Sequence, residues 1–306
     1  TILMDIQSGT IGYFGGWYVY ASAVFMVMSL VLALVPRTGS IRLGSDHERP
    51  EFSRFAWFSM MFGAGIGVGM LTYSTAEPLA HFANNPDVIM GTTSALERDN
   101  LAAAYKWTLL HYGLTPWGCY AIVGMSLAYF AYRRDMPLTI RSPFTAVLGP
   151  ETARRVGAVV DAAAILATII GIGVTIGYGV NQLTFGMHQI TAWEWLVSDG
   201  KPSLAALSLA VILLTLAAML SALSGIGRGI RWLSNLNMVL SWLLLVIFIV
   251  FGATAFAGEM FVSGLTEYLR AIPAMSVTIW DGGDTPTALA LSDWQSAWTI
   301  FYWAWW

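Results

Sequence analysis

The 306-residue sequence has few charges and almost no cysteine. Charged residues make up 11% of the chain, hydrophobic residues make up 57%, and the mean hydropathy is +0.64. Soluble domains average roughly 25% charged residues, so the composition excludes an ordinary soluble domain. The net charge of −3 provides no basic face, which argues against a nucleic-acid-binding protein. Cys119 is the only cysteine, so the sequence cannot form an internal disulfide.

Enzyme signatures are also missing. No HExxH or other metal-ligand spacing is present among the four histidines, and no pair of carboxylates lies inside an apolar block. The histidines are His47, His81, His111 and His188. Glu77 stands beside Pro78 at the end of an apolar block, where we expect a capping or interfacial role. Residues 1–16 lack the basic and apolar regions of a signal peptide. We therefore expect no catalytic residues, no enzymatic activity and no cofactor.

What the sequence does contain is a series of apolar blocks, each about long enough to cross a bilayer. Six blocks are complete and a seventh begins near the end: 17–36, 55–76, 107–130, 157–187, 203–222, 236–258 and 294–306. They predict an all-α membrane protein in which residues 1–306 form a single transmembrane domain.

The basic residues predict the orientation of this domain. Eleven of the fifteen lysines and arginines lie in segments 37–54, 131–156 and 223–235. Cytoplasmic loops carry such an excess of positive charge, so these segments should face the cytoplasm of an inner (plasma) membrane. Segment 223–236 also carries apolar residues on one face, which predicts a short amphipathic helix at the inner interface.

Glycine alternates with other residues in the second block, at Gly63, Gly65, Gly67 and Gly69. One interpretation is close helix packing through overlapping GxxxG pairs. The other is an unwound segment whose exposed carbonyl groups could bind Na⁺. The pattern by itself favours neither.

The third block carries three aromatic residues, Tyr112, Trp117 and Tyr120. On one helix they would fall within an arc of about 140°. Aromatic residues at this level are common in interfacial belts, and alone the arc favours a belt. Pro116 predicts a kink there, which fits a ligand site better.

The last nine residues include four tryptophans, at positions 298, 303, 305 and 306. Indole rings attract cations through their faces, so several rings around one cavity suit a quaternary ammonium group. In the fourth block, Thr168 and Thr175 lie among glycines. Helix packing is the default explanation there, although the two hydroxyls could contribute ligands to Na⁺.

Four stretches of this sequence together resemble the betaine/carnitine/choline transporter family: 50–57, 63–78, 229–237 and 298–306. The resemblance covers essentially the whole chain. It implies a leucine-transporter-like fold with two inverted repeats, of which this chain holds the first and the start of the second. By the same comparison the chain lacks the first span and the C-terminal half. The resemblance favours the unwound interpretation of the glycine segment.

The resemblance also implies roles for individual residues. The substrate cage would consist of Tyr112, Trp117, Tyr120, Trp303, Trp305 and Trp306, with Thr72 beside it. Sodium would be bound by the carbonyls of Gly63 and Ile66, with Thr168 and Thr175 as further candidates. Gly65, Gly67 and Gly69 would form the flexible break. Tyr112 replaces the family's usual tryptophan and Thr72 replaces a Phe or Trp, so the cage should be smaller or more polar.

The charged residues predict which ion is coupled to transport. Proton-coupled choline members of the family tend to carry an Asp among the alternating glycines, and this chain has none there. No Lys or Arg lies between residues 157 and 186. We therefore expect Na⁺-coupled uptake of a small quaternary ammonium or sulfonium compatible solute such as glycine betaine. The alternatives are a proton-coupled choline or carnitine transporter, and a non-transporting fragment or interaction subunit. The expected partners are the solute, Na⁺ and membrane lipid; the resemblance also allows a homotrimer.

Overall fold

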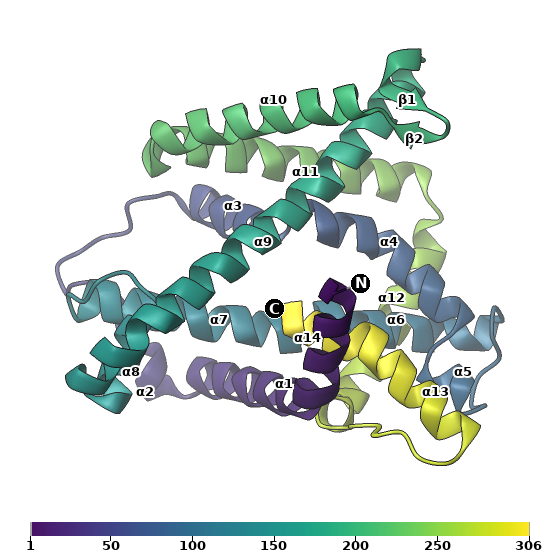
Figure 1. Ribbon diagram of the computed structural model, residues 1–306, viewed down its shortest axis with the longest axis horizontal. Coiled ribbons are helices and arrows are strands. Elements are labelled where there is room, and N and C mark those ends of the chain that lie inside the picture. The colour runs from purple at the N-terminus through teal and green to yellow at the C-terminus, as the bar shows by residue number, and fades with distance from the viewer. Residues whose placement is uncertain (1, 306) are drawn as a thin grey trace. The chain divides into compact units, whose positions relative to one another are not determined.

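The computed structural model describes residues 2–305, and most of them are helical (Figure 1). The chain divides into two compact units, which are described separately. The first unit comprises residues 1–48, 76–164 and 255–306, and the second comprises residues 49–75 and 165–254. Helices α4 (Val68–Ala83) and α9 (Pro150–Thr191) are each shared between the two units.

The remaining elements of the first unit are helical. They are α1 (Ile2–Leu34), α2 (Pro36–Gly39), α5 (Pro86–Ile89), η1 (Arg98–Asn100), α6 (Leu101–Tyr112), α7 (Leu114–Ala128), η2 (Tyr129–Arg133), α8 (Arg141–Leu148), α12 (Thr254–Met275), α13 (Pro286–Gln295), η5 (Ser296–Ile300) and α14 (Phe301–Trp305). The second unit contains α3 (Arg54–Gly65), η3 (Glu194–Leu196), β1 (Val197–Ser198), β2 (Lys201–Pro202), α10 (Leu204–Leu223), η4 (Ile226–Ile230) and α11 (Arg231–Phe251). The two short strands pair antiparallel, with Val197 opposite Pro202.

Four helical segments are long and apolar enough to cross a membrane: Met4–Leu34, Pro150–Thr191, Leu204–Leu223 and Ile226–Phe251. In the apolar 18-residue stretch of Pro150–Thr191, none of the residues is buried by other parts of the protein, as expected for a surface that faces lipid. Segment 223–236 forms no separate interface helix, because η4 leads directly into α11 as part of one apolar segment. The structure therefore has the character of an all-α, multi-pass membrane protein.

A fifth candidate span is broken. Helix α3 ends at Gly65, α4 begins at Val68, and the pair bends by 67° at residues 66 and 67. The Ile66 amide still donates to the Phe62 carbonyl, which closes the last turn of α3. The break falls among the alternating glycines, where the backbone loses more conformational entropy in a helix than it does at alanine.

The third apolar block is also divided. Helix α6 ends at Tyr112 and α7 begins at Leu114, with Gly113 between them at φ −94° and ψ −137°. The kink expected at Pro116 therefore lies three residues earlier. The predicted arc of Tyr112, Trp117 and Tyr120 assumed one continuous helix and was wrong for this reason: Tyr112 belongs to α6, and the other two belong to α7.

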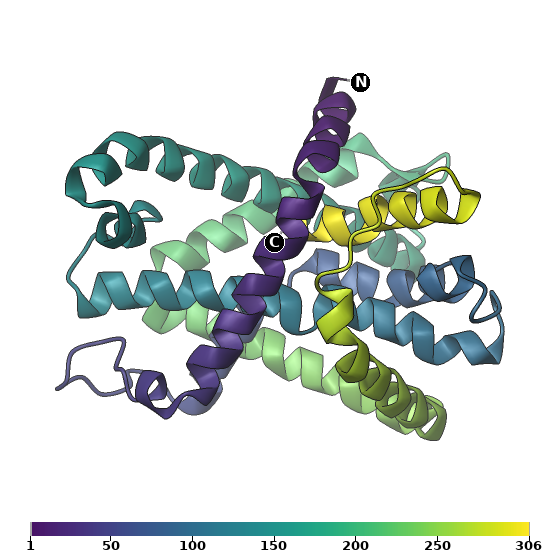
Figure 2. The same cartoon turned by 90° about the horizontal axis from the view of Figure 1, so that it is seen from below.

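Helix α1 crosses α7 at close range in the first unit (Figure 2). A Cβ atom added to Gly118 would lie 2.5 Å from Met26 Cα and 2.9 Å from Met26 N. The Ser29 hydroxyl donates to the Gly118 carbonyl over 2.9 Å. Only glycine allows the two backbones to approach this closely, as is common where membrane helices pack.

We expect Gly118→Ala to destabilise the protein by about 1–3 kcal/mol, because the added methyl group must push α1 away from α7. Gly124→Ala on the same helix is the matched control, since no atom lies within 4 Å of its added Cβ. Thermal unfolding of the purified protein, followed by tryptophan fluorescence, compares the two. Equal melting temperatures for both variants would contradict the close crossing.

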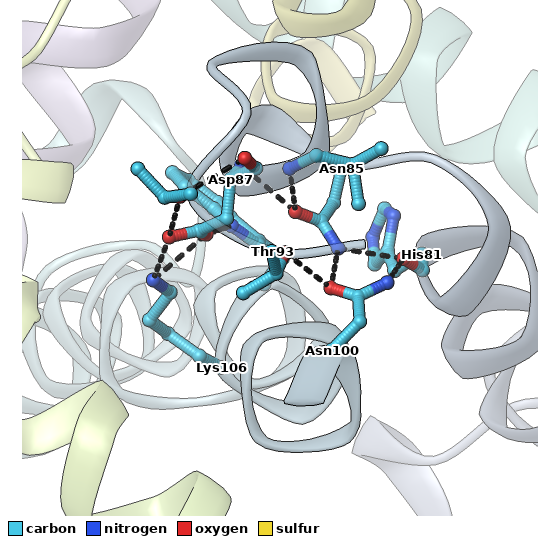
Figure 3. Close-up of polar contacts among 9 residues, drawn as sticks. His81, Asn85, Asp87, Thr93, Asn100 and Lys106 are labelled. Atoms are coloured by element: carbon cyan, nitrogen blue, oxygen red, sulfur yellow. Dashed lines mark hydrogen bonds and ion pairs between the residues drawn. The ribbon is translucent and has the colours of Figure 1, made fainter. Parts of the chain in front are cut away.

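The C-terminal end of α4 is fixed by buried asparagines (Figure 3). The last carbonyl groups of a helix have no partner within the helix. Asn100 Nδ2 donates to the carbonyls of Phe82 (2.7 Å) and His81 (3.2 Å), and Asn85 Nδ2 donates to the His81 carbonyl over 2.7 Å. Asn100 Oδ1 accepts in turn from Asn85 and from Thr93.

An ion pair stabilises the turn that follows. Lys106 Nζ lies 2.8 Å from Asp87 Oδ2, and Trp107 Nε1 donates to the same oxygen over 2.5 Å. Asn85 caps α5 by accepting from the amides of Asp87 and Val88. These contacts join α4, α5 and α6 into a rigid support for the residues at the end of α4.

Asn100→Ala should destabilise the protein by about 1–3 kcal/mol, because it removes one of the two donors to each of the His81 and Phe82 carbonyls and the buried acceptor of Asn85 and Thr93. Asn84→Ala is the control, since Asn84 is exposed and two residues from Phe82 in sequence. Chemical denaturation in detergent measures both free energies of unfolding. A loss below 1 kcal/mol for Asn100→Ala would mean that these hydrogen bonds do not hold α4.

Candidate functional site

A fully buried carboxylate, that of Glu77, is the centre of the polar contacts in the first unit. His81 lies one turn further along α4, and its Nε2 is 3.0 Å from Glu77 Oε1. His111 Nδ1 on α6 lies 2.5 Å from the same oxygen. The Tyr302 hydroxyl on α14 donates to the other oxygen, Oε2, over 2.6 Å. Three helices therefore meet at one carboxylate.

His111 extends these contacts to the π turn η5. Its Nε2 lies 3.0 Å from Thr299 Oγ1. Its ring stacks on Tyr302 with centroids 4.9 Å apart and planes 17° apart, and it meets Trp303 edge to face at 5.8 Å. His81 packs against the rings of Trp294 and Trp298. The site is therefore polar at its centre and enclosed by aromatic rings.

The expected role of Glu77 as a capping or interfacial residue was wrong. It lies inside α4 with no exposed surface, because His81, His111 and Tyr302 supply the partners that a buried carboxylate needs. The ligand atoms of Glu77, His81 and His111 all lie within 4.8 Å of one another, a donor set that could hold a metal ion. Sequence spacing missed this cluster because His111 lies 34 residues from Glu77. The spacing of Glu77 and His81 by one helical turn was the visible signal.

A chain of hydroxyl groups leads from this carboxylate to Tyr112, one of the predicted cage residues. Since the Tyr302 hydroxyl donates to Glu77, its oxygen accepts from the Tyr112 hydroxyl, 2.8 Å away. Trp117 Nε1 donates to the Tyr112 carbonyl over 3.0 Å, and the ring of Trp117 meets Tyr120 at 5.6 Å. The structure therefore brings Tyr112, Trp117 and Tyr120 together across the break at Gly113.

The C-terminal tryptophans have different surroundings. Trp303 is buried against His111. Trp305 is 40% exposed and packs against Phe301 with centroids 5.8 Å apart. Trp306 lies outside the described residues. Tyr302, which sequence reasoning passed over, is a residue of this segment that contacts Tyr112.

The predicted sodium residues belong to the second unit. Thr175 Cγ2 lies 3.5 Å from the position that a Cβ on Gly67 would take, so α9 passes close to the break. A Cβ atom added to Gly63 would lie 3.5 Å from Ser234 Oγ and 3.8 Å from Asn237 Nδ2. Thr168 lies two helical turns before Thr175, on an exposed part of α9.

Around the break, Ile66 forms the non-helical link with Gly67, while Gly65 and Gly69 lie in the flanking helices. The structure thus places the methyl group of Thr175 beside the non-helical backbone at Gly67, and the side chains of Ser234 and Asn237 on α11 beside Gly63 in the last turns of α3. The hydroxyl and amide of these two α11 side chains are groups of the kind that surround a small cation or a water molecule.

Thr72 lies just beyond the break and contacts α9. The Gln182 side-chain amide donates to the Thr72 hydroxyl, which itself donates to the Val68 carbonyl over 2.9 Å. One residue on, the Tyr73 and Tyr178 hydroxyls lie 3.2 Å apart. The family resemblance leads us to expect a large aromatic residue at position 72. Here hydrogen bonds at Thr72 and Tyr73 link α4 to α9 instead.

The chain is similar in sequence to known transporters. The model of the betaine/carnitine/choline family of transporters matches residues 1–306. The chain is 36% identical over 304 residues to an osmo-dependent choline transporter of Acinetobacter baylyi, covering 99% of this chain and 41% of the relative. It is 37% identical over 292 residues to the high-affinity choline transport protein of Escherichia coli K12, covering 95% and 40%.

A third relative, a glycine betaine transporter of Bacillus subtilis, is 36% identical over 295 residues, which is 96% of this chain and 54% of the relative. The chain thus spans between two fifths and a little over half of the length of these relatives. With the family model matching every residue, the chain belongs to the betaine/carnitine/choline family of transporters.

Proposed function

We propose that the protein acts as a secondary transporter that takes up a small quaternary ammonium or sulfonium solute together with Na⁺. The observation that carries this proposal is the gathering of Tyr112, Trp117 and Tyr120 on either side of the Gly113 break. Membership of the family supports it, and the names of the relatives favour choline or glycine betaine as the solute.

The chemistry of these side chains suits such a solute. A trimethylammonium group carries a positive charge but offers no hydrogen-bond donor, so aromatic faces are its natural partners. Each ring contributes about 0.5–2 kcal/mol when the contact is desolvated. Trp303, Trp305 and Trp306 are proposed as further cage members, and Thr72 as a neighbour that limits the size of the group bound.

Sodium coupling is proposed from the broken helix. The carbonyl groups around Gly63 and Ile66 lie where α3 ends, and broken helices at membrane depth bind coupling ions through such groups. Thr175 lies against Gly67, and Thr168 is a further candidate on the same helix. Alternating access would come from the rocking of one inverted repeat against the other, as in related folds.

Proton-coupled choline transport is the second candidate, because two of the relatives above are named choline transporters and a titratable cluster lies at the buried centre of the first unit. The two candidates differ in ion dependence. Choline uptake by proteoliposomes that persists when K⁺ replaces Na⁺, and that follows an imposed pH gradient, would favour proton coupling.

Substitutions at Trp117 test the cage. Both Trp117→Phe and Trp117→Leu lose the hydrogen bond to the Tyr112 carbonyl, but only Leu loses the aromatic face. We expect the full-length Leu variant to bind choline or glycine betaine roughly tenfold more weakly than the Phe variant, equivalent to about 1.4 kcal/mol. Equilibrium binding by calorimetry measures both. Similar affinities for the two variants would show that Trp117 packs without contacting the cation.

Substitutions at Thr175 test the sodium site. Thr175→Val keeps the methyl group that packs against Gly67 and loses the hydroxyl, whereas Thr175→Ser keeps the hydroxyl. If the hydroxyl binds Na⁺, the Na⁺ concentration for half-maximal uptake should rise roughly tenfold in the Val variant and change little in the Ser variant. The opposite order would assign the residue to helix packing.

A further inference from the structure

Helix α7 starts at the Gly113 break without a cap from its own sequence. Gly113 holds the N-cap position, where a serine, threonine, asparagine or aspartate side chain commonly accepts from an amide of the first turn. Glycine has no side chain to do so, and the amides of a first turn have no partner within their own helix. The first of these amides, that of Leu114, therefore depends on an acceptor from elsewhere in the protein.

That acceptor is the hydroxyl of Tyr268, a residue of α12 that lies 154 positions further along the chain. The Leu114 amide donates to the Tyr268 oxygen over 2.7 Å, and only 2% of Tyr268 is exposed. Burial raises the pKa of this phenol to about 12, so it is a neutral hydroxyl at physiological pH. Tyr268 thus does for α7 what an N-cap side chain would otherwise do.

A close contact between α12 and α6 places Tyr268 at the break. A Cβ atom added to Gly264 would lie 2.4 Å from Tyr105 Cβ, so the two helices touch at this point. Gly264 and Tyr268 are four residues apart and therefore lie on the same face of α12. One turn beyond the contact, the Tyr268 hydroxyl would lie 2.5 Å from a Cβ on Gly113. The hydroxyl thus occupies the space that a side chain at position 113 would need.

The geometry of this break determines where two rings of the proposed cage lie. Tyr112 is the last residue of α6, and Trp117 lies in the first turn of α7. The Trp117 indole reaches back across the break and donates to the Tyr112 carbonyl over 3.0 Å. Because each residue is fixed to a different helix, a change in the angle between the helices would separate the two groups.

We propose that Tyr268 is a positioning residue for the proposed cage. By accepting from the Leu114 amide, its hydroxyl holds α7 at the angle to α6 that lets Trp117 bond to Tyr112. Tyr268 acts on the solute through these helices and not by touching it. This inference rests on the proposed function, because it takes Tyr112 and Trp117 as members of the cage.

Tyr268→Phe in the full-length protein in nanodiscs tests the proposal, because it removes the hydroxyl and keeps the buried ring. We expect the affinity for choline or glycine betaine, measured by calorimetry, to fall roughly tenfold. In protein labelled with fluorotryptophan, the fluorine resonance of Trp117, assigned by its absence in Trp117→Phe, should shift. Both measurements are made well below the melting temperature of each variant, so that a loss of stability alone changes neither.

A second pair of variants moves α12 without altering the break itself. Gly264→Ala should push α12 away from α6 and draw the Tyr268 hydroxyl from the Leu114 amide. It should therefore weaken binding and shift the Trp117 resonance, as Tyr268→Phe does. Gly258→Ala on the same helix is the matched control, since no atom lies within 4 Å of its added Cβ. It should leave both measurements unchanged, and equal effects of the two glycine variants would contradict the proposal.

The outcomes separate this inference from the proposed function. Wild-type protein that binds neither solute would overturn the proposed function, whereas a Trp117 resonance that still shifts in Tyr268→Phe would support the positioning of Trp117 by Tyr268. Wild-type binding that Tyr268→Phe leaves unchanged would overturn the positioning role alone. Weaker binding with an unshifted Trp117 resonance would also overturn it, because the hydroxyl would then act by a route other than Trp117.

Discussion

A carboxylate can be buried only if its oxygens are hydrogen-bonded, and Glu77 meets this requirement with partners from three separate segments. His81 is one turn away on the same helix, whereas His111 and Tyr302 come from 34 and 225 residues further along the chain. Removing any one partner would leave a buried charge or donor unsatisfied, at a cost of several kcal/mol. The position of α4 relative to α6 and α14 in the first unit therefore depends on this one group.

The proposed cage is arranged around the same contacts. Tyr302 contacts both Glu77 and Tyr112, so the ring of Tyr112 is held by the interaction that buries the carboxylate. The break at Gly113 then allows Trp117 to turn back and donate to the Tyr112 carbonyl. An aromatic site built this way is ordered before a ligand arrives, which reduces the entropy cost of binding.

The sequence was most informative where a local rule decides the structure. Apolar length predicted the membrane-spanning segments near α1, α9, α10 and α11, and alternating glycines marked the segment in which α3 gives way to α4. Contacts between distant segments were not predictable. Glu77 beside a proline at the end of an apolar block is equally compatible with an interfacial residue, and its burial depends on His111 and Tyr302. The break at Gly113 was displaced from Pro116 because proline is tolerated in the first turn of the new helix α7.

The most direct test of this account is a double-mutant cycle on the free energy of unfolding of the substrate-free, full-length protein. The variants are Glu77→Gln, Tyr302→Phe and the two combined. If the buried carboxylate and the Tyr302 hydroxyl stabilise each other as the 2.6 Å contact indicates, the coupling energy should be about 1–3 kcal/mol. Effects that add to within about 0.5 kcal/mol would contradict the claim that this interaction holds α4 and α14 together.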